Sequence, residues 1–448
     1  MSPRPLILVV IDGLTPSMLE AVIGSGEAPN FAALGALGAY RRGTSVFPSL
    51  TPVCLSSIAT GAHGDVHEVP HLVWYDRREE RLVEYGSSFG AVRAAGIGRT
   101  LRDTLVNMNG QHLGKQAVTL FESLADAGLR TAAVNFTAYR GRTEHRSALP
   151  FLGSVLGPER FFFYNLFSSD RTGAPLSFRN RPAGSIDAYA TAVGRWLVTR
   201  DAFDFLVFYL SDYDYASHAH GPDTALEALR RCDAAIGSVA DAAGGIEALI
   251  ERYAVVLMSD HGQTHVRAAT SLAEVYAGVE GVLPLGSNRA GHVYLLEGCR
   301  LDPREVAARL DDVGAAEVTL FREGADAVAR REGEELAFRP AAVGGFTLSG
   351  DATILDHPDA LRRAWAALGN PNAGEVLVSA AEGHEFADLG GGNHIGGGSH
   401  GSLVTGDSEV PLLTVGVEGT ASSIVDVAPL VLAHFGVTAP AYLLGRAA

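Results

Sequence analysis

Lysine is almost absent from this chain of 448 residues, where Lys115 is the single example. Arginine supplies nearly all of the positive charge, and no run rich in basic residues is present. Acidic residues outnumber basic residues by 51 to 35, which gives a formal net charge of −16. A protein that binds the backbone of a nucleic acid needs a basic patch or stripe. We therefore expect a small-molecule ligand, and no nucleic-acid duplex, as the partner.

Cysteine and long apolar runs are also scarce. The three cysteines, Cys54, Cys232 and Cys299, are widely spaced and form no CxxC pair, which argues against a disulfide framework. No apolar stretch reaches the roughly 18 residues of a membrane-spanning helix. The first apolar segment, Leu6–Ile11, is too short for a secretory signal. These absences predict a cytoplasmic protein without a membrane segment.

Apolar residues make up 47% of the chain and gather in short runs. Continuous runs of this length are typical of strands that are buried on both faces of a parallel sheet. Helical patterns at residues 119–127 and 185–199 lie between them. The alternation predicts an α/β fold, a doubly wound, mostly parallel sheet with helices on both faces. The predicted strands are residues 6–11, 131–135, 203–210, 254–258 and 411–415.

Two regions interrupt this alternation. Residues 62–115 are rich in histidine, arginine and glycine without a clear repeat, which suggests a lid or a long loop near the site. Residues 265–385 have strand and helix patterns of their own, so we expect a small α+β insertion, or cap. The predicted division is a catalytic core over 1–264, the cap over 265–385 and the completion of the core over 386–448, closing with an amphipathic helix at 422–435. Within the cap the patterns predict strands at 292–296, 316–321 and 335–338 and a helix at 303–313.

Aspartates follow three of the predicted strands. Asp12 directly follows the first strand, and Asp214 lies just beyond the third. Asp260 and His261 lie just beyond the fourth. Ligands of an open parallel sheet bind beyond the carboxyl ends of its strands. One such aspartate is usually a turn former, but three of them with histidines nearby indicate a metal site, because Zn²⁺ accepts carboxylate and imidazole ligands.

Histidines complete the set of candidate ligands. Asp214 and His218 are four residues apart, so one helical turn could direct both side chains at one ion. Asp212 and His220 are the competing pair in the same segment. His261 could instead be a core histidine with its hydrogen bonds satisfied.

The last ligand is expected late in the chain, around the glycine-rich loop 390–398. His384, His394 and His400 are the candidates in this region. His400 lies closest before the next core strand, so we choose it, with His394 as the alternative.

The predicted nucleophile is Thr51, which precedes Pro52 and a helix-like segment. A threonine before a proline is typical of a helix N-cap, so capping alone is the alternative role. A hydroxyl at a helix N-terminus also lies beside free N–H groups and the positive end of the helix dipole, which suits a phosphate. Contact with a metal would lower the pKa of the hydroxyl and favour nucleophilic attack.

These residues lie in five short motifs that resemble the alkaline phosphatase superfamily, in particular its type I phosphodiesterase/nucleotide pyrophosphatase family. The motifs follow the order of that family, and the core around them covers most of the chain outside the cap. They are VVIDG at 9–13, FPSLTP at 47–52, DYASHAHGP at 214–222, SDHG at 259–262 and SHGS at 399–402.

The resemblance implies a phosphoester hydrolase with two divalent metal ions, most commonly zinc. Attack by Thr51 on phosphorus would form a covalent phosphothreonine, which water then hydrolyses. One metal would be held by Asp214, His218 and His400, and the other by Asp12, Asp260, His261 and the oxygen of Thr51.

The chain departs from the family pattern at Cys54, where the resemblance implies a hydrogen-bonding contact with the phosphate that a thiol makes only weakly. We predict a phosphodiesterase or nucleotide pyrophosphatase; the alternatives are a phosphonate hydrolase resembling phosphonoacetate hydrolase, a phosphomonoesterase, and an inactive binding scaffold of the same fold. A sulfatase is excluded because Cys54 lacks the following proline and arginine of that motif. A dinucleotide-dependent oxidoreductase is excluded because no GxGxxG follows the first strand.

Overall fold

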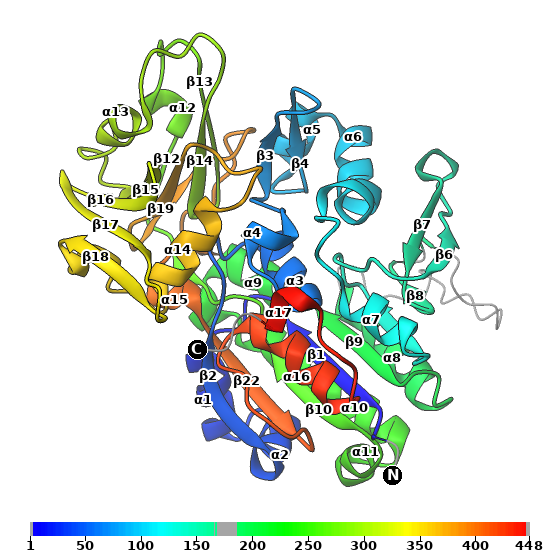
Figure 1. The fold of residues 1–448 in the computed structure, drawn as a ribbon. Helices are drawn as coiled ribbons and strands as arrows, with labels where there is room; N and C mark the ends of the chain where they lie inside the picture. The colour runs from blue at the N-terminus through cyan, green and yellow to red at the C-terminus, as the bar shows by residue number, and fades with distance from the viewer. Residues whose placement is uncertain (1–2, 165, 168–185, 445–448) are drawn as a thin grey trace.

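The computed structural model describes residues 3–164, 166–167 and 186–444, which contain two separate seven-stranded sheets (Figure 1). In the first sheet five neighbouring strands are parallel, in the order β10-β1-β9-β5-β8. Strand β22 runs antiparallel to β10 and pairs on its other side with β2 at the sheet edge. The bounds are β1 Leu6–Ile11, β2 Ala39–Thr44, β5 Thr131–Val134, β8 Arg160–Phe162, β9 Phe205–Leu210, β10 Ala254–Met258 and β22 Glu409–Val415.

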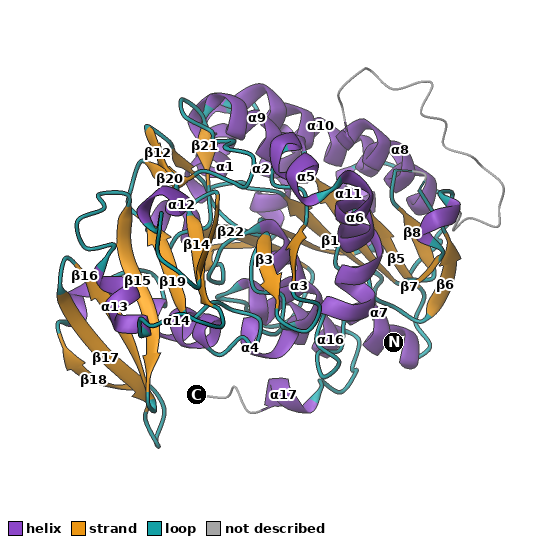
Figure 2. Ribbon diagram, turned by 90° about the horizontal axis from the view of Figure 1, so that it is seen from above, coloured by secondary structure: helices purple, strands orange, loops and turns teal. Residues whose placement is uncertain are grey.

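Helices pack on both faces of this sheet, because its strands are apolar on both sides. In β1, Leu6, Leu8 and Val10 point into one hydrophobic cluster, and Ile7 and Val9 point into another. Figure 2 shows the parallel strands between the two layers of helices. One layer contains α3 Thr51–Thr60, α7 Leu120–Asp126 and α16 Val427–His434; the other contains α1 Pro16–Ser25, α2 Pro29–Leu37, α8 Ile186–Val198, α10 Leu226–Ala243 and α11 Ile246–Arg252. The prediction of a mostly parallel sheet with helices is confirmed.

The second sheet is antiparallel throughout and lies within residues 282–380. Helix α14 Ala360–Leu368 packs on one face, while α12 Leu272–Val275 and α13 Pro303–Ala308 pack on the other. In sheet order its strands are β13 Val282–Ser287, β14 Ala290–Leu295, β19 Val376–Ala380, β15 Ala316–Glu323, β16 Asp326–Arg331, β17 Glu334–Pro340 and β18 Phe346–Gly350.

The segment 62–115 is not a long loop, so that part of its prediction is wrong. It forms a β-hairpin and several short helices, and its Trp74 and Met108 are buried in the same cluster as α3. None of its elements exceeds ten residues, which is too short for a visible period in the sequence. The elements are α4 Gly64–His67, β3 Val73–Asp76, β4 Arg81–Glu84, α5 Phe89–Ala95, α6 Ile97–Arg102 and the π-helix η1 Asp103–His112.

The remaining elements are short and connect the larger ones. They are η2 Pro150–Leu152, β6 Thr143–Arg146, β7 Ser154–Gly157, α9 Asp212–His220, η4 Pro222–Thr224, β11 Thr264–His265, β12 Ala268–Thr270, η5 Ala352–Leu355, β20 His384–Phe386, β21 Gly398–Ser399, α15 Thr405–Ser408, η6 Ile424–Asp426 and α17 Ala441–Leu444.

Several predicted helices are shorter in the structure. The pattern at 119–127 becomes α7, for which Thr119 is the N-cap in a capping box with Glu122. The pattern at 185–199 becomes α8, with Ser185 outside the described residues. The predicted helix at 422–435 begins as the 3-10 turn η6, which continues directly into α16.

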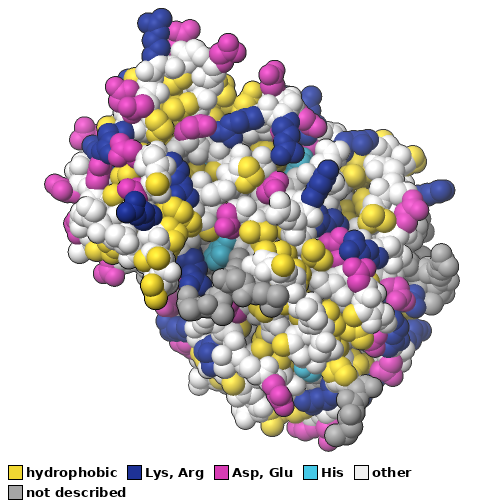
Figure 3. Space-filling view, in the orientation of Figure 1, with side chains coloured by type: hydrophobic (Ala, Val, Ile, Leu, Met, Phe, Trp, Pro, Cys, Tyr) yellow, Lys and Arg dark blue, Asp and Glu magenta, His cyan; other side chains and the backbone are white. Residues whose placement is uncertain are grey.

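No helix in the described part of the chain is both long and apolar enough to cross a membrane. On the face of the molecule in Figure 3, arginine and acidic side chains are interspersed.

Candidate active site

The carboxyl edge of the parallel sheet brings the predicted aspartates together. Val10 pairs with Met258, so Asp12 and Asp260 emerge at the same level from neighbouring strands. On the other side of β1, Ile11 pairs with Leu210, after which the chain enters α9 and places Asp214 in its first turn. Strand register therefore explains why residues far apart in sequence meet.

Asp12, Asp260 and His261 form one group of possible metal ligands. One donor atom from each lies within 4.8 Å of the others. His261 Nε2 is 3.2 Å from Asp12 Oδ1 and 3.5 Å from Asp260 Oδ2. Both carboxylate oxygens are buried and receive no well-formed hydrogen bond from the described residues. Such oxygens fit a bound cation, because a buried carboxylate needs a compensating partner.

Asp214, His261 and His400 form the second group, again with donor atoms within 4.8 Å of one another. The rings of His261 and His400 are stacked with centroids 3.6 Å apart, which joins the two groups. His218 Nε2 lies 3.3 Å from Asp214 Oδ2, and His400 Nε2 lies 3.9 Å from Asp214 Oδ1. His218 is therefore close to Asp214 Oδ2, whereas His400 is close to Asp214 Oδ1.

Each of the three histidines is anchored through Nδ1 to a backbone carbonyl. The acceptors are Gly262 O at 3.0 Å from His261, Gly398 O at 2.8 Å from His218, and Ser49 O at 2.8 Å from His400. A carbonyl can only accept, so Nδ1 carries the proton and Nε2 is the atom available as a ligand. This is the arrangement that orients histidine ligands in metal sites.

The cluster carries excess negative charge in a buried place. Burial and the charge of Asp214 raise the pKa of Asp12, and burial and the charge of Asp12 raise the pKa of Asp260 well above its usual value. Burial alone would lower the pKa of His261, but the carboxylates around it raise that pKa to about 10. His261 supplies one positive charge to three aspartates, and bound divalent cations would neutralise the negative charge that remains.

Thr51 is the first residue of α3, and its hydroxyl does not cap the helix. The N-cap is Leu50, and no side chain makes the capping hydrogen bond. Thr51 Oγ1 instead lies 3.2 Å from His261 Nε2, at the ligand cluster. The alternative reading as an N-cap is therefore wrong. The backbone of Ser49 holds this segment in place, since its N–H donates to Gly401 O beside His400.

Cys54 lies behind the cluster. Its side chain is fully buried, and Sγ is 3.3 Å from Ser45 Oγ. Burial raises the pKa of this thiol well above its usual value. Cys54 does not line the cavity at the site, so this placement gives no support to the substrate contact expected there.

The competing ligand candidates have other partners or lie elsewhere. The Asp212 carboxylate accepts hydrogen bonds from the backbone of Ile186 and Asp187 at the start of α8. His220 is exposed at the end of α9, and His384 Nδ1 lies 3.3 Å from Glu382 O. His394 does lie near the cluster: its ring stacks on His218 with centroids 4.1 Å apart. Its Nδ1 lies 3.0 Å from Glu385 Oε2.

A cavity of about 360 Å³ opens beside the cluster. Thr51, Asp12, Asp214, His218 and His400 are among its lining residues. The lining also includes residues that the sequence analysis did not single out, namely Tyr85, Thr104, Met108, Asn135, Thr137, Phe163, Tyr164, Tyr209, Ser211 and Asn288. The signal for Asn135 was present in the sequence, because it follows an apolar strand as Asp12 does, but the predicted strand 131–135 included it.

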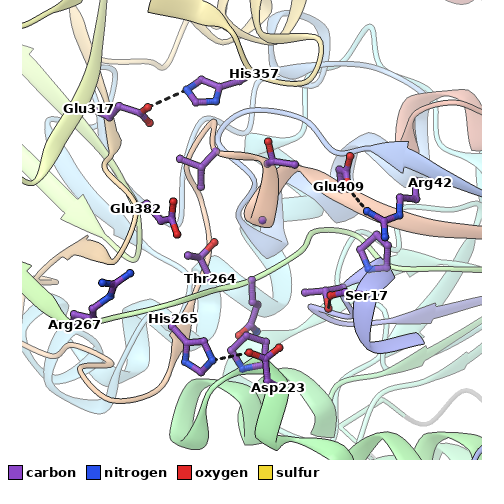
Figure 4. A pocket seen from close by; sticks show the side chains of 17 residues that line it. Ser17, Arg42, Asp223, Thr264, His265, Arg267, Glu317, His357, Glu382 and Glu409 are labelled. Carbon is purple, nitrogen blue, oxygen red and sulfur yellow. Dashed lines mark hydrogen bonds and ion pairs between the residues drawn. The ribbon is translucent and has the colours of Figure 1, made fainter. Parts of the chain in front are cut away.

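A second cavity, of about 570 Å³, lies near β11 and α15 (Figure 4). Several of its polar groups are paired with one another: Glu317 lies 3.2 Å from His357, Arg42 lies 3.0 Å from Glu409, and Figure 4 shows both pairs as dashed lines. None of the candidate ligands or Thr51 lines this cavity. The candidate ligand cluster therefore lies beside the smaller cavity.

Comparison with known proteins gives one family match. A family model described as type I phosphodiesterase/nucleotide pyrophosphatase matches residues 6–403. Phosphonoacetate hydrolase from Sinorhizobium meliloti, solved with phosphonoformate, has a TM-score of 0.65 and 20% identity over 98% of this chain and 96% of that chain. Human ectonucleotide pyrophosphatase/phosphodiesterase 5 has a TM-score of 0.64 and 15% identity over 97% and 96%. At these identities the two structures establish a shared fold.

Proposed function

We propose, from the premise that this chain belongs to the type I phosphodiesterase/nucleotide pyrophosphatase family of the alkaline phosphatase superfamily, that it hydrolyses phosphodiesters or nucleotide-type esters with two divalent metal ions. We propose zinc for both ions, because Zn²⁺ accepts the nitrogen and oxygen donors of this site. One ion would be held by Asp12, Asp260, His261 and the Thr51 oxygen. The other would be held by Asp214, His218 and His400.

The observation that carries this proposal is the position of Thr51. Its Oγ1 lies 3.2 Å from His261 Nε2, at the point where two groups of buried metal-type donors meet. A threonine that served only to begin a helix would have no reason to contact that cluster. The N-terminus of α3 also presents the positive end of its dipole to an incoming phosphate.

The chain's own residues define the steps. Thr51 Oγ would attack phosphorus in line with the departing ester oxygen, so that a phosphothreonine forms as the alcohol leaves. Water would then break the Thr51–phosphorus bond and restore the hydroxyl. When bound, the two cations would lower the pKa of the Thr51 hydroxyl and stabilise charge on the phosphoryl oxygens. Asp12, Asp214 and Asp260 hold the negative charge that attracts those cations.

The domain division of the sequence analysis remains part of the proposal. Residues 1–264 and 386–448 would form the catalytic core, and residues 265–385 would form a cap. The segment 62–115 supports a substrate-side role, since its Tyr85, Thr104 and Met108 line the cavity. A cytoplasmic location stays a prediction.

The test is turnover by purified, zinc-loaded protein of three nitrophenyl compounds: a phosphate monoester, a phosphodiester and a phenylphosphonate ester. We expect the diester to have the highest kcat/KM. A strong preference for the monoester or for a phosphonate would replace the diester assignment with one of the alternatives.

The matched variants are Thr51→Ala and Thr51→Ser. The alanine variant should lose activity by about a thousandfold or more, because it lacks the nucleophile, whereas serine should retain part of it. Full activity in Thr51→Ala, or no turnover of any ester by the zinc-loaded wild type, would contradict the proposal and favour a binding scaffold.

A further inference from the structure

The cavity beside the metal-type ligands has two chemically different halves. One half contains Asp12 and Asp214, which follow β1 and β9 and belong to the ligand cluster. The other half is defined by its uncharged lining residues, which come from the segment 62–115 and from positions just after β5, β8 and β9. No lysine or arginine is present among the described residues that line the cavity, and its only carboxylates, Asp12 and Asp214, belong to the ligand cluster. The uncharged half is lined by Tyr85, Ser87, Thr104, Met108, Asn135, Thr137, Phe163, Tyr164 and Ser211.

Asn135 stands out in this half because its amide is buried without a partner. The side chain is 1% exposed, and neither Oδ1 nor Nδ2 has a hydrogen-bond partner in the part of the chain that the structure describes. Its backbone N–H donates to Phe162 O at 2.8 Å, which fixes the residue between the ends of β5 and β8. A buried amide with neither hydrogen bond is unfavourable unless a ligand or water completes it.

The backbone of Asn135 is also unusual. Its φ is +57°, in the left-handed region that asparagine tolerates better than most residues. Residues kept in that region by the surrounding fold are concentrated at functional sites. Here the left-handed residue directly follows β5 and lines the cavity, with its amide buried at the cavity wall.

Ser211 presents a second unpartnered group from the neighbouring strand. Its Oγ is buried and lacks a hydrogen-bond partner among the described residues. Val134 pairs with Phe208, so Asn135 lies beside Tyr209, and Ser211 follows two residues later. Neighbouring strands are about 4.8 Å apart, so Asn135 and Ser211 can reach one bound group. The Tyr209 hydroxyl donates to Asp12, which links this half directly to the ligand cluster.

We propose that this half of the cavity binds an uncharged, hydroxyl-bearing organic group of the ester, and that Asn135 is the residue that recognises it. The inference rests on the proposed phosphodiesterase function and adds the substrate class. The amide can donate to the hydroxyl oxygen and accept the hydroxyl proton. A carboxylate or a further phosphate would lose its hydration without gaining a cationic partner, which is costly in a buried site.

The experiment uses four nitrophenyl diesters that differ only in the end of a three-carbon chain: propyl, hydroxypropyl, carboxyethyl and aminopropyl. For the zinc-loaded wild type we expect hydroxypropyl to exceed propyl in kcat/KM by about tenfold, the effect of one to two hydrogen bonds. The carboxyethyl ester should be the poorest. A preference for carboxyethyl or aminopropyl, or equal turnover of all four, overturns the inference and leaves the proposed function standing. Absence of turnover for all four, with Thr51→Ala no different, refutes both.

Asn135→Gly removes the amide while permitting the positive φ. Its hydroxypropyl-to-propyl ratio should fall to about one, because the ratio depends on the hydrogen bonds to the hydroxyl. A ratio unchanged from wild type overturns the role of Asn135. The ratio compares two substrates on one preparation, so partial misfolding does not affect it.

Asn135→Asp provides a second variant of the same shape. Its carboxylate should lower the carboxyethyl-to-hydroxypropyl ratio further, by about tenfold, and raise the relative rate of the aminopropyl ester. The matched control is Glu332→Gly, an exposed residue between β16 and β17 whose φ is +51°. It should leave all the ratios at wild-type values. Unchanged ratios in Asn135→Asp would contradict the proposed contact.

Discussion

The two sheets of this protein each have seven strands but contribute very differently to the site. Beyond the carboxyl ends of the parallel strands lie Asp12, Asp214, Asp260 and His261. The antiparallel sheet contributes one residue to the described lining of the cavity, Asn288, from the turn between β13 and β14. Asn288 Nδ2 donates to His400 Nε2 at 3.1 Å.

The difference follows from strand direction. In a parallel sheet every strand ends at the same edge, so the residues that follow the strands converge without further adjustment. In an antiparallel sheet successive strands end at opposite edges, and a single turn is what reaches the site. The chemistry should therefore be sensitive to the first sheet and tolerant of changes in the second.

The largest effect is expected for Asp260→Asn. The amide oxygen can still accept from the N–H groups of Gly13 and His261, which donate to Asp260 Oδ1 at 3.2 and 3.0 Å. The charge that would hold a cation is lost, so zinc content and kcat/KM should fall, the latter by about a thousandfold or more. Metal analysis and turnover measure both.

In metal-free protein the same variant should be stabilised, although it loses activity when zinc is supplied. It removes the Asp260 carboxyl, whose ionisation burial and the charge of Asp12 oppose, so the Tm of the metal-free form should rise. Asp223→Asn, which alters an exposed ion pair with His265, is the control and should change neither quantity. If Asp260→Asn kept wild-type zinc content and activity, the carboxyl edge of the parallel sheet would not be the metal site.

A smaller effect is expected for Asn288→Gly, where the antiparallel sheet touches the site. Glycine tolerates the φ of +54° at this position but cannot donate to His400. A cation on His400 Nε2 would replace this hydrogen bond, so the amide acts mainly on the metal-free site. The kcat/KM of the zinc-loaded protein should therefore fall by no more than about tenfold, the effect of one to two hydrogen bonds, with zinc retained. A fall in kcat/KM as large as that of Asp260→Asn would show that the antiparallel sheet matters to catalysis as much as the parallel sheet does.

Leu336→Ala in β17 should separate stability from chemistry. Leu336 is 1% exposed and packs in the cluster between the antiparallel sheet and α14. Its truncation should cost about 2–5 kcal/mol of unfolding free energy, because a cavity remains. Urea unfolding should show that loss while kcat/KM of the folded enzyme stays within about twofold. A large fall in kcat/KM would give the second sheet a direct role.

The smallest effect concerns Asp187, a buried carboxylate near the same sheet edge that is not a ligand. Burial and the charge of Asp212 raise the pKa of Asp187 to about 7. Unfolded aspartate titrates near about 4, so between these values the folded state keeps a proton that the unfolded state has released. This contribution to stability is complete at low pH and declines as pH rises toward 7.

Asp187→Asn should remove that contribution. The variant's unfolding free energy should fall less steeply with pH than that of the wild type, by up to about 1.4 kcal/mol per pH unit. Urea unfolding at several values between about pH 4 and 7 gives the two slopes. Identical slopes would show that Asp187 is ionised in the folded protein.

The sequence predicted the parallel sheet and the meeting of its aspartates because both depend on short, strong patterns. The residue after each apolar run was informative, and Asp12 shows this most directly. The same rule missed Asn135, since an uncharged residue at the end of an apolar run looks like one more strand position. It also misjudged residues 62–115, whose elements are stabilised by burial of side chains such as Trp74 against the core and not by local periodicity.

Thr51 shows another limit of prediction from sequence patterns. Threonine before proline is a helix-start signal, and the sequence alone left capping and nucleophilic attack as alternatives. Backbone geometry excludes capping, because the helix begins one residue earlier than the pattern suggests and leaves the hydroxyl free of that role, whereas nucleophilic attack stays a prediction. Cys54 was singled out by position in a motif, but its direction, into the core, depends on packing that the motif does not contain.

Strand β2, which leads toward Thr51, is hydrogen-bonded to the sheet only through β22 among the described strands. A strand at residues 39–44 is therefore held by a strand more than 360 residues later in the chain. A growing chain that has not yet added residues 409–415 lacks the partner that docks β2, even with all five parallel strands complete. A truncation before β22 should therefore free β2 from the sheet, while the Ser49 N–H, which donates to Gly401 O, still ties the segment beside Thr51 to the loop of His400.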